Sequence, residues 1–284
     1  SKDKHAVTEQ IISLPGVKKE IVAGVKIDGG SLEFYGCGNQ PVSLGDLQGN
    51  KFELVVRNLD DEKAEKITFV ENYFDEQRFS LNNIKIGQHL IKKEFAKAVS
   101  LIDEVKVKRC LEQKPSDYVG ALKTLPTRLL RMYVNAYQSY LWNEIMAEFL
   151  RKKGKLLNEI DYSQGKLVFV KDSDQFLDLE IPIIGFDSED KKIGQDLKVL
   201  IKNILSKEKI TYSDFIIRQI PELTLEGEMR KAFTEIKDLK IGKIEKDELN
   251  YGKKKVKLSL SLGKGSYATM VIKALLDQKL EQTI

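Results

Sequence analysis

Cysteine and histidine are scarce in this chain of 284 residues, which has two of each. Cys37 and Cys110 lie far apart in the sequence, and neither His5 nor His89 lies close to a cysteine. Zinc ribbons and dithiol redox motifs need closely spaced cysteines, and a disulfide framework needs more of them. We therefore expect no metal site and no structural disulfide.

Long apolar runs are also absent. No stretch approaches the roughly 20 apolar residues that a membrane-spanning helix needs, and no secretory leader pattern is present. Hydrophobic residues make up 42% of the chain and charged residues 32%, which is typical of a soluble globular protein. We expect a cytoplasmic monomer, because nothing in the apolar pattern demands a partner chain or a membrane.

Basic residues cluster, although the net charge is only +4. The clusters lie at Lys18-Lys19, Lys92-Lys93, 106–109, 151–155, Lys191-Lys192 and 253–255. Such clusters can follow a phosphate backbone. Each one taken alone is more often a solvated face of the protein, so no single cluster decides the function.

The two ends of the chain have strand-like patterns, and the middle has a helical one. Strands are predicted at 10–14, 31–35, 51–57, 165–170 and 256–262. Helices are predicted at 87–103, 127–153, 194–205 and 267–280, with a further helical pattern from residue 213. This order predicts an α+β protein in which residues 1–102 and 235–284 form one domain and residues 103–234 form an inserted one.

A cluster of aromatic and polar side chains occupies residues 72–79, Asn-Tyr-Phe-Asp-Glu-Gln-Arg-Phe. Aromatic rings stack on nucleobases, Arg binds phosphate with two hydrogen bonds, and Asn or Gln reads base edges. Asn72, Phe74, Gln77 and Arg78 are therefore candidate RNA-binding residues. The alternative is an aromatic edge of the core in which Arg78 pairs with Glu76.

The turn Gly263-Lys264-Gly265-Ser266-Tyr267 joins a predicted strand to a predicted helix. Free backbone N–H groups at such a turn attract anions. The turn lacks the spacing of a Walker loop and of a dinucleotide fingerprint, which disfavours nucleotide hydrolysis and NAD chemistry. The alternative is a tight turn in which Ser266 caps the helix.

Asp3 lies between Lys2 and Lys4 at the start of the chain. A carboxylate that neighbouring cations hold in its ionised form can act as a nucleophile or a base. An acidic residue near a terminus is more often a solvated surface group, so this position needs support from elsewhere in the chain.

Five ordered blocks provide that support through a family resemblance. Residues 2–10, Lys-Asp-Lys-His-Ala-Val-Thr-Glu-Gln, resemble the K-D-x-x-A-x-T-x-Q signature of TruD-type pseudouridine synthases. Residues 44–52 resemble the family's LGxLxGNxF, 72–79 its NYFGxQRF, 136–143 its AxxSxxxN-type helix, and 265–269 its GSYAT turn. Because the five blocks are spread over nearly the whole chain, chance agreement is an unlikely explanation.

The resemblance implies isomerisation of a specific uridine in tRNA to pseudouridine, without a cofactor. It implies that Asp3 is catalytic, that Phe74 stacks on the target uracil and that Asn72 supports the site. Lys2, Lys4 and Arg78 would neutralise flanking phosphates, and Gln77, Gly265, Ser266 and Tyr267 would also bind substrate. It further implies a mostly antiparallel sheet with flanking helices, interrupted by an inserted α+β domain specific to TruD members.

Two departures from the family pattern accompany the resemblance. Asp75 and Ser80 stand where the family usually has glycine, and Asp75 adds a negative charge beside the expected phosphate site. We also expect family members to carry a segment before the first block, with strands and a basic residue that assists the aspartate. A non-catalytic RNA-binding or tRNA-folding module is the alternative function, and a glycosidase is disfavoured because no motif places a second carboxylate.

Overall fold

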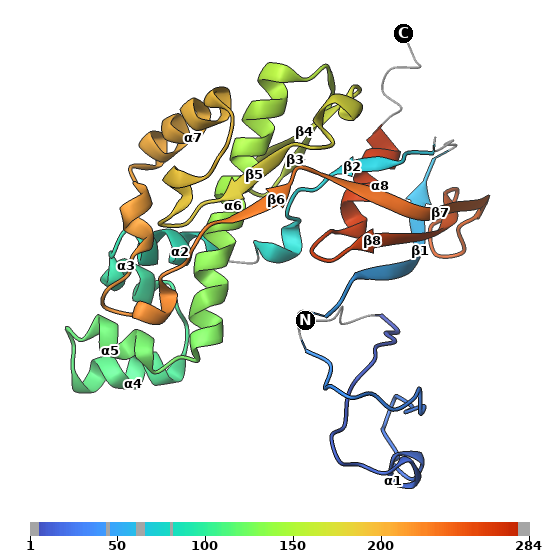
Figure 1. The fold of residues 1–284 in the computed structure, drawn as a ribbon, viewed down its shortest axis with the longest axis horizontal. Coiled ribbons are helices and arrows are strands. Elements are labelled where there is room, and N and C mark those ends of the chain that lie inside the picture. Colours follow the sequence, from blue (N-terminus) through green and yellow to red (C-terminus); the bar gives the residue numbers. More distant parts are fainter. Residues whose placement is uncertain (1–5, 44–45, 61–65, 80–81, 278–284) are drawn as a thin grey trace. The chain divides into compact units, whose positions relative to one another are not determined.

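The computed structural model describes residues 6–43, 46–60, 66–79 and 82–277. The chain divides into two compact units, Ser1–Gln48 and Gly49–Ile284. Figure 1 shows the helices and strands of each unit.

The described residues of the first unit form one short helix, α1 (Lys19–Ala23), and one isolated β-bridge between Ile27 and Gly30. No described residue of this unit is buried; Ile11 is 62% exposed and Tyr35 is 87% exposed. The strands predicted at 10–14 and 31–35 are therefore wrong. A strand pattern becomes a strand only where a neighbouring strand accepts its hydrogen bonds, and the described residues of this unit form no such strand.

The second unit contains a four-stranded antiparallel sheet with the strand order β1-β8-β7-β2. Its strands are β1 (Gly49–Leu59), β2 (Phe69–Glu71), β7 (Phe233–Lys246) and β8 (Lys254–Gly263). Leu258, Leu260 and Leu262 alternate with less buried residues along β8, as the sequence predicted. Helix α8 (Ala268–Asp277) follows β8 and packs against β2.

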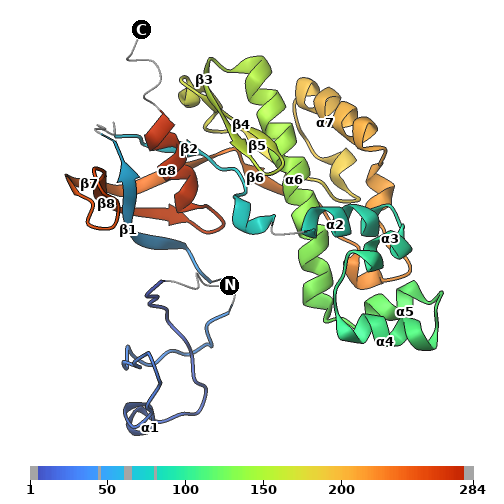
Figure 2. The ribbon, with the colours of Figure 1, turned by 180° about the vertical axis from the view of Figure 1, so that it is seen from behind.

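Helix α6 (Thr127–Lys153) lies at the centre of the rest of the second unit, and its bounds are the predicted ones. It begins directly after Pro126, which the first turn of a helix tolerates because its N–H groups have no partner within the helix. Helices α2 (Asn83–Ile91) and α7 (Gln195–Glu208) and strands β4 (Gly165–Val170) and β5 (Glu180–Ile183) pack on α6 (Figures 1 and 2). Trp142 is fully buried in this core.

Two strand pairs flank α6: β4 with β3 (Leu156–Tyr162), and β5 with β6 (Glu228–Lys231). Strand β6 leads directly into β7, so a nearly continuous extended segment joins the β5–β6 pair to the four-stranded sheet (Figure 1). The smaller helices are α3 (Phe95–Ser100), α4 (Val105–Gln113) and α5 (Tyr118–Lys123), and the short 3₁₀ turns are Glu76–Arg78, Ser173–Phe176, Ser188–Asp190, Tyr212–Phe215 and Pro221–Leu223.

The predicted α+β class is confirmed, whereas two helix predictions need correction. The helix expected at 87–103 is two helices, α2 and α3, separated by a turn in which Lys93 has a positive φ of 57°. The helical pattern from residue 213 forms only a 3₁₀ turn. The domain boundaries at 102/103 and 234/235 stay a prediction. In the described parts of the chain, no helix is long and apolar enough to cross a membrane.

Candidate functional site

The segment that follows β2 is held on one side by strand β4. The carboxylate of Glu71 accepts a hydrogen bond from the Val170 N–H at 2.9 Å. The Tyr73 hydroxyl accepts one from the Val168 N–H at 3.2 Å and donates one to the Val168 carbonyl at 3.0 Å. Burial raises the pKa of Glu71 to about 7, although the bond from Val170 opposes the shift. These contacts fix the two residues on either side of Asn72.

Phe74 is held on the other side by a side chain of α6. The Asn143 amide accepts from the Phe74 N–H and donates to the Phe74 carbonyl, both at 2.9 Å. Asn143 is buried, so this pair of bonds satisfies backbone groups that water does not reach. The block 136–143 therefore positions the block 72–79.

Asn72 continues the ladder of hydrogen bonds between β2 and the β6–β7 segment. Its N–H donates to the Ala232 carbonyl at 2.7 Å, and its side-chain amide donates to the Lys231 carbonyl at 3.1 Å. The two oxygens of Asn72 then face Arg230, whose Nη2 lies 2.7 Å from the main-chain oxygen and 2.9 Å from Oδ1. Asn72 thus acts as an orienting residue for Arg230 in the free protein.

Arg230 is the residue of this site that the sequence analysis missed. Its Nη2 also donates to the Gly265 carbonyl at 3.0 Å, and its guanidinium carbon lies 4.2 Å from the Phe74 ring centroid and 5.2 Å from that of Trp142. Both distances fit cation–π contacts. Burial lowers the pKa of Arg230 to about 10, so the side chain remains charged at neutral pH. No sequence motif marks position 230.

Arg78 is a second cation at the same ring. Its guanidinium carbon lies 5.9 Å from the Phe74 centroid, and its Nε donates to the Ser139 hydroxyl at 3.2 Å. The alternative pairing with Glu76 is wrong, because the Glu76 carboxylate accepts from the N–H and hydroxyl of Ser163 at 2.7 and 2.6 Å. The other donors of Arg78 make no hydrogen bond with residues that the structure describes.

The glycine turn brings Tyr267 to the same ring. The ring centroids of Phe74 and Tyr267 lie 6.4 Å apart in an edge-to-face arrangement. Gly265 has a φ of +80°, which favours glycine, and its carbonyl is the one that Arg230 binds. The Ser266 hydroxyl, which the sequence also allowed as a helix cap, donates to Thr234 Oγ1 at 3.1 Å.

Asp75, the departure from the family glycine, is neutralised in the structure. It is buried, and its carboxylate accepts from the Thr269 hydroxyl at 2.6 Å and from the Lys273 ammonium at 3.0 Å. Both partners lie on α8. The added negative charge is thus compensated by Lys273, and the pair fastens the site segment to α8.

The structure brings together Asn72, Phe74, Arg78 and Tyr267, with Arg230 among them. Gly265 and Ser266 lie in the turn beside this cluster, which we call the Phe74 cluster. Gln77 is exposed, and its side chain makes no hydrogen bond with the described residues. Lys2, Asp3 and Lys4 lie outside the described residues, so their predicted roles stay predictions.

The Phe74 ring is only 7% exposed in the free protein. Trp142 packs against the Phe74 ring in an edge-to-face arrangement and is fully buried. Arg230 and Tyr267, which contact the same ring, are partly exposed. A base could stack on this ring only if Arg230 or Tyr267 moved aside. Stacking of uracil on Phe74 therefore stays a prediction that requires a rearrangement.

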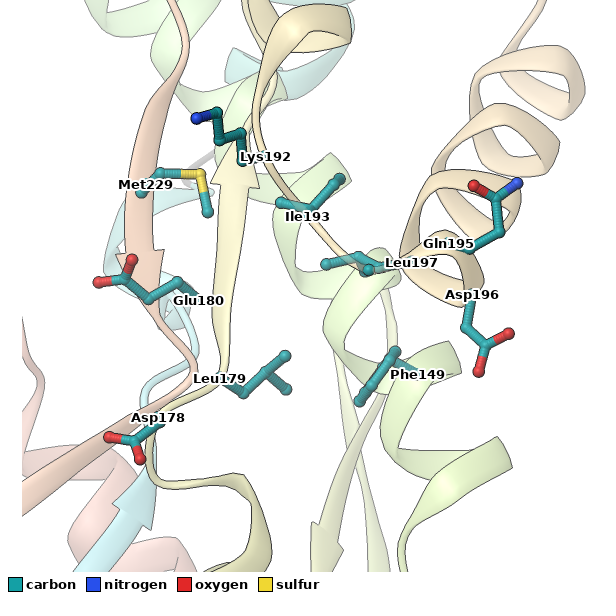
Figure 3. Close-up of a pocket in the computed structure, with 11 residues that line it drawn as sticks. Phe149, Asp178, Leu179, Glu180, Lys192, Ile193, Gln195, Asp196, Leu197 and Met229 are labelled. Carbon is teal, nitrogen blue, oxygen red and sulfur yellow. The ribbon is translucent and has the colours of Figure 1, made fainter.

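A separate cavity of about 550 Å³ lies between α6, α7 and the β5–β6 pair. Figure 3 shows Asp178 and Glu180 on the strand side and Asp196 at the start of α7. Lys192 also lines this cavity, but the three carboxylates outnumber it, so the cavity is a poor candidate for RNA. Across the described ranges, no group of three or more His, Cys, Asp or Glu side chains could hold a metal ion.

Comparisons with solved structures relate this fold to a known one. A crystal structure from Methanosarcina mazei, whose name carries the designation TruD, superimposes with a TM-score of 0.66. The match covers 92% of this chain and 76% of that chain, at 21% sequence identity. This likeness concerns the fold.

Comparisons of sequence give the family. The family model described as tRNA pseudouridine synthase D (TruD) matches residues 1–108 and 100–275. A Methanocaldococcus jannaschii protein named "Probable tRNA pseudouridine synthase D 2" is 34% identical over 96% of this chain and 76% of its own length. The Methanococcus maripaludis "Probable tRNA pseudouridine synthase D 1" is 31% identical over 96% of this chain and 83% of its own. The chain therefore belongs to the TruD family of tRNA pseudouridine synthases.

Proposed function

We propose that this chain isomerises a specific uridine in tRNA to pseudouridine, without a cofactor, as a cytoplasmic monomer. The observation that carries the proposal is family membership over nearly the whole chain, from the Asp3 block to the glycine turn. An Aquifex aeolicus relative, 29% identical over 96% of this chain, is named tRNA pseudouridine synthase D. The Phe74 cluster supports the same function by its chemistry.

Asp3 would provide the reacting carboxylate. Isomerisation breaks the N-glycosidic bond and rejoins the base through carbon, so an anionic group is needed at the ribose. Asp3 would either attack the ribose or take its C2′ proton, and Lys2 and Lys4 would keep the carboxylate ionised. This assignment rests on the motif at residues 2–10.

The Phe74 cluster would hold the nucleotide around the reacting base. A base that is to be rotated must first leave its stack, which requires an apolar or aromatic surface and cations for the flanking phosphates. Phe74 and Tyr267 offer the aromatic surface, and Arg78, together with Lys2 and Lys4, would supply the cations. Asn72 orients Arg230, so its supporting role would be indirect in the free protein.

The test is a map of pseudouridine in tRNA treated with the purified chain. Carbodiimide-dependent stops of reverse transcriptase detect pseudouridine and give its position. We expect a new stop with the wild-type chain and none with Asp3→Asn, while Asp161→Asn, which changes an exposed aspartate on β3, keeps the stop. The Aquifex aeolicus relative is a control for the assay.

Two results would overturn parts of this proposal. Full pseudouridine formation by Asp3→Asn would remove Asp3 from the mechanism. Tight binding of tRNA by the wild-type chain with no pseudouridine at any position would favour the alternative, a non-catalytic RNA-binding or tRNA-folding module.

A further inference from the structure

Arg78 and Arg230 lie at the same aromatic ring, and no carboxylate among the described residues pairs with either of them. Within the described residues, Arg57 binds Asp247 and Arg151 binds Glu159, both at 2.7 Å. Arg230 instead binds carbonyl and amide oxygens, and Arg78 binds one hydroxyl. Two positive charges thus share one aromatic ring without a described counter-ion.

This arrangement is unfavourable in the free protein. A charge that is removed from water without a counter-ion loses solvation free energy that neutral hydrogen bonds only partly replace. Burial lowers the pKa of Arg230, and the charge of Arg78 lowers it further. Unfavourable charges of this kind gather at functional sites more often than elsewhere.

The contacts also leave donors unused. The bonds of Arg230 to described residues come from Nε and Nη2, and the bond of Arg78 comes from Nε. Nη1 of Arg230 and both terminal nitrogens of Arg78 make no hydrogen bond within the described part of the chain, so a ligand could use them. Both side chains are partly exposed, so a ligand can reach them.

We propose that Arg78 and Arg230 together form an anion site beside Phe74 that binds a backbone phosphate next to the uridine that is isomerised. The planar fork of a guanidinium matches two phosphate oxygens, and both forks converge on the ring. Arg230 is also a positioning residue, because the same side chain holds Asn72 and the Gly265 turn. The nature of the anion rests on the proposed function.

A phosphodiester fits this place better than a small carboxylate metabolite. The site adjoins aromatic rings that a base could use, and a nucleotide is the ligand that presents a base and a phosphate together. Asp75, a buried carboxylate nearby, is already bound to Lys273 and Thr269 on α8.

The first experiment measures tRNA binding as a function of salt and does not depend on isomerisation. Loss of one phosphate contact reduces the slope of log K against log salt by about 0.7 to 0.9 and weakens binding by about tenfold or more. We expect this of Arg78→Gln and of Arg230→Gln, using unmodified tRNA transcripts as the probe. Arg218→Gln, which removes an exposed arginine, tests whether any lost cation has the same effect.

Folding is checked for each variant, since Arg230→Gln also loses contacts to Asn72 and Gly265. If its melting temperature falls strongly, Arg78→Gln decides the test, because Arg78 makes only one described hydrogen bond. Arg78→Lys keeps the charge and loses the fork, and we expect it to keep the salt slope and to lose part of the affinity.

A second experiment places the contact on the RNA. Once the modified uridine is mapped, a single neutral methylphosphonate replaces the phosphate on its 5′ side or on its 3′ side. We expect one of these two substitutions to weaken tRNA binding by the wild-type chain. The same substitution should not weaken tRNA binding by Arg78→Gln any further. An unchanged salt slope in both arginine variants, with only a lower turnover, would overturn the proposal and indicate that the arginines act on the catalytic carboxylate. If the wild-type chain binds tRNA with the expected salt slope but forms no pseudouridine, the result contradicts the proposed function instead.

Discussion

Glu71 shows how a single buried side chain can make the fold sensitive to pH. It is buried beneath the site segment and accepts a hydrogen bond from Val170. Burial raises its pKa from the ordinary 4.5 to about 7, so the folded protein holds a proton that the unfolded chain releases. Stability from this group is present below pH 4.5 and is lost as the pH rises through about 7.

The prediction is that Glu71→Gln removes this dependence. The rise in the pKa of Glu71 from 4.5 to about 7 corresponds to a loss of roughly 3 kcal/mol in the free energy of unfolding between pH 4 and pH 8. The glutamine keeps an oxygen for Val170 and carries no charge, so the variant should gain stability relative to the wild type as the pH rises. Urea denaturation at both pH values measures the difference. Glu112→Gln, at an exposed position on α4, should change little, and an equal change in both variants would contradict the prediction.

Single residues of the site were predictable where a motif marks them. Asn72, Phe74, Arg78 and Tyr267 were singled out from local patterns, and the structure brings them together at the Phe74 ring, whereas their roles on RNA stay predictions. Arg230 was not predictable, because its role arises from a contact between residues 158 positions apart in the chain. Only the pairing of β6 and β7 with their neighbours brings it to Asn72.

Elements with a regular period were predictable, and elements with an interrupted period were not. Strand β8 alternates and α6 is long and begins after a proline, and both have the expected bounds to within two residues. Strand β7 was missed because Phe233, Ile236 and Leu239 are spaced by three, which imitates a helix. The hydrogen-bonded pairing of β7 with β8 shifts register around Asp238, whose φ is 54°. This β-bulge explains why the buried residues of β7 are three positions apart and not two.

The attachment of the site segment to α8 gives a prediction for elements. Asp75 and Lys273 form an ion pair in which the Asp75 side chain is 5% exposed and that of Lys273 is 26% exposed. Either Asp75→Asn or Lys273→Met leaves a partner without its counter-ion, so both should lower the unfolding free energy. The double variant should recover part of the loss, with a coupling of about 1 to 3 kcal/mol.

A parallel cycle tests whether burial is the cause of that coupling. Lys51 and Glu53 form an exposed pair at 3.6 Å, which water and salt screen. Their double-variant cycle should show coupling near zero. Additive effects at Asp75 and Lys273 would mean that this pair does not hold α8 to the segment.

At the scale of the whole molecule, the two units differ in how much they bury. The described residues of the first unit include no buried side chain, whereas the second unit contains the hydrophobic core around α6. Segments with few buried contacts open at low free energy and are cut first by proteases. The unit that carries the Asp3 motif therefore has little internal stability, and the unit that carries the Phe74 cluster has most of it.

Limited proteolysis with trypsin tests this difference. We expect cleavage first after Lys18, Lys19 or Lys26, all partly or fully exposed, and late cleavage in α6. Under the proposed function, the cut chain should lose pseudouridine formation, because Asp3 is separated from the second unit. The cut chain should still bind tRNA, and the dependence of this binding on salt should keep the contribution of Arg78 and Arg230. Mass spectrometry gives the cleavage sites, and early cleavage in α6 at the same rate would contradict the prediction. Protection of all three lysines by added tRNA would show that bound tRNA shields the first unit from the protease, as we expect if the unit that carries the Asp3 motif lies against the substrate.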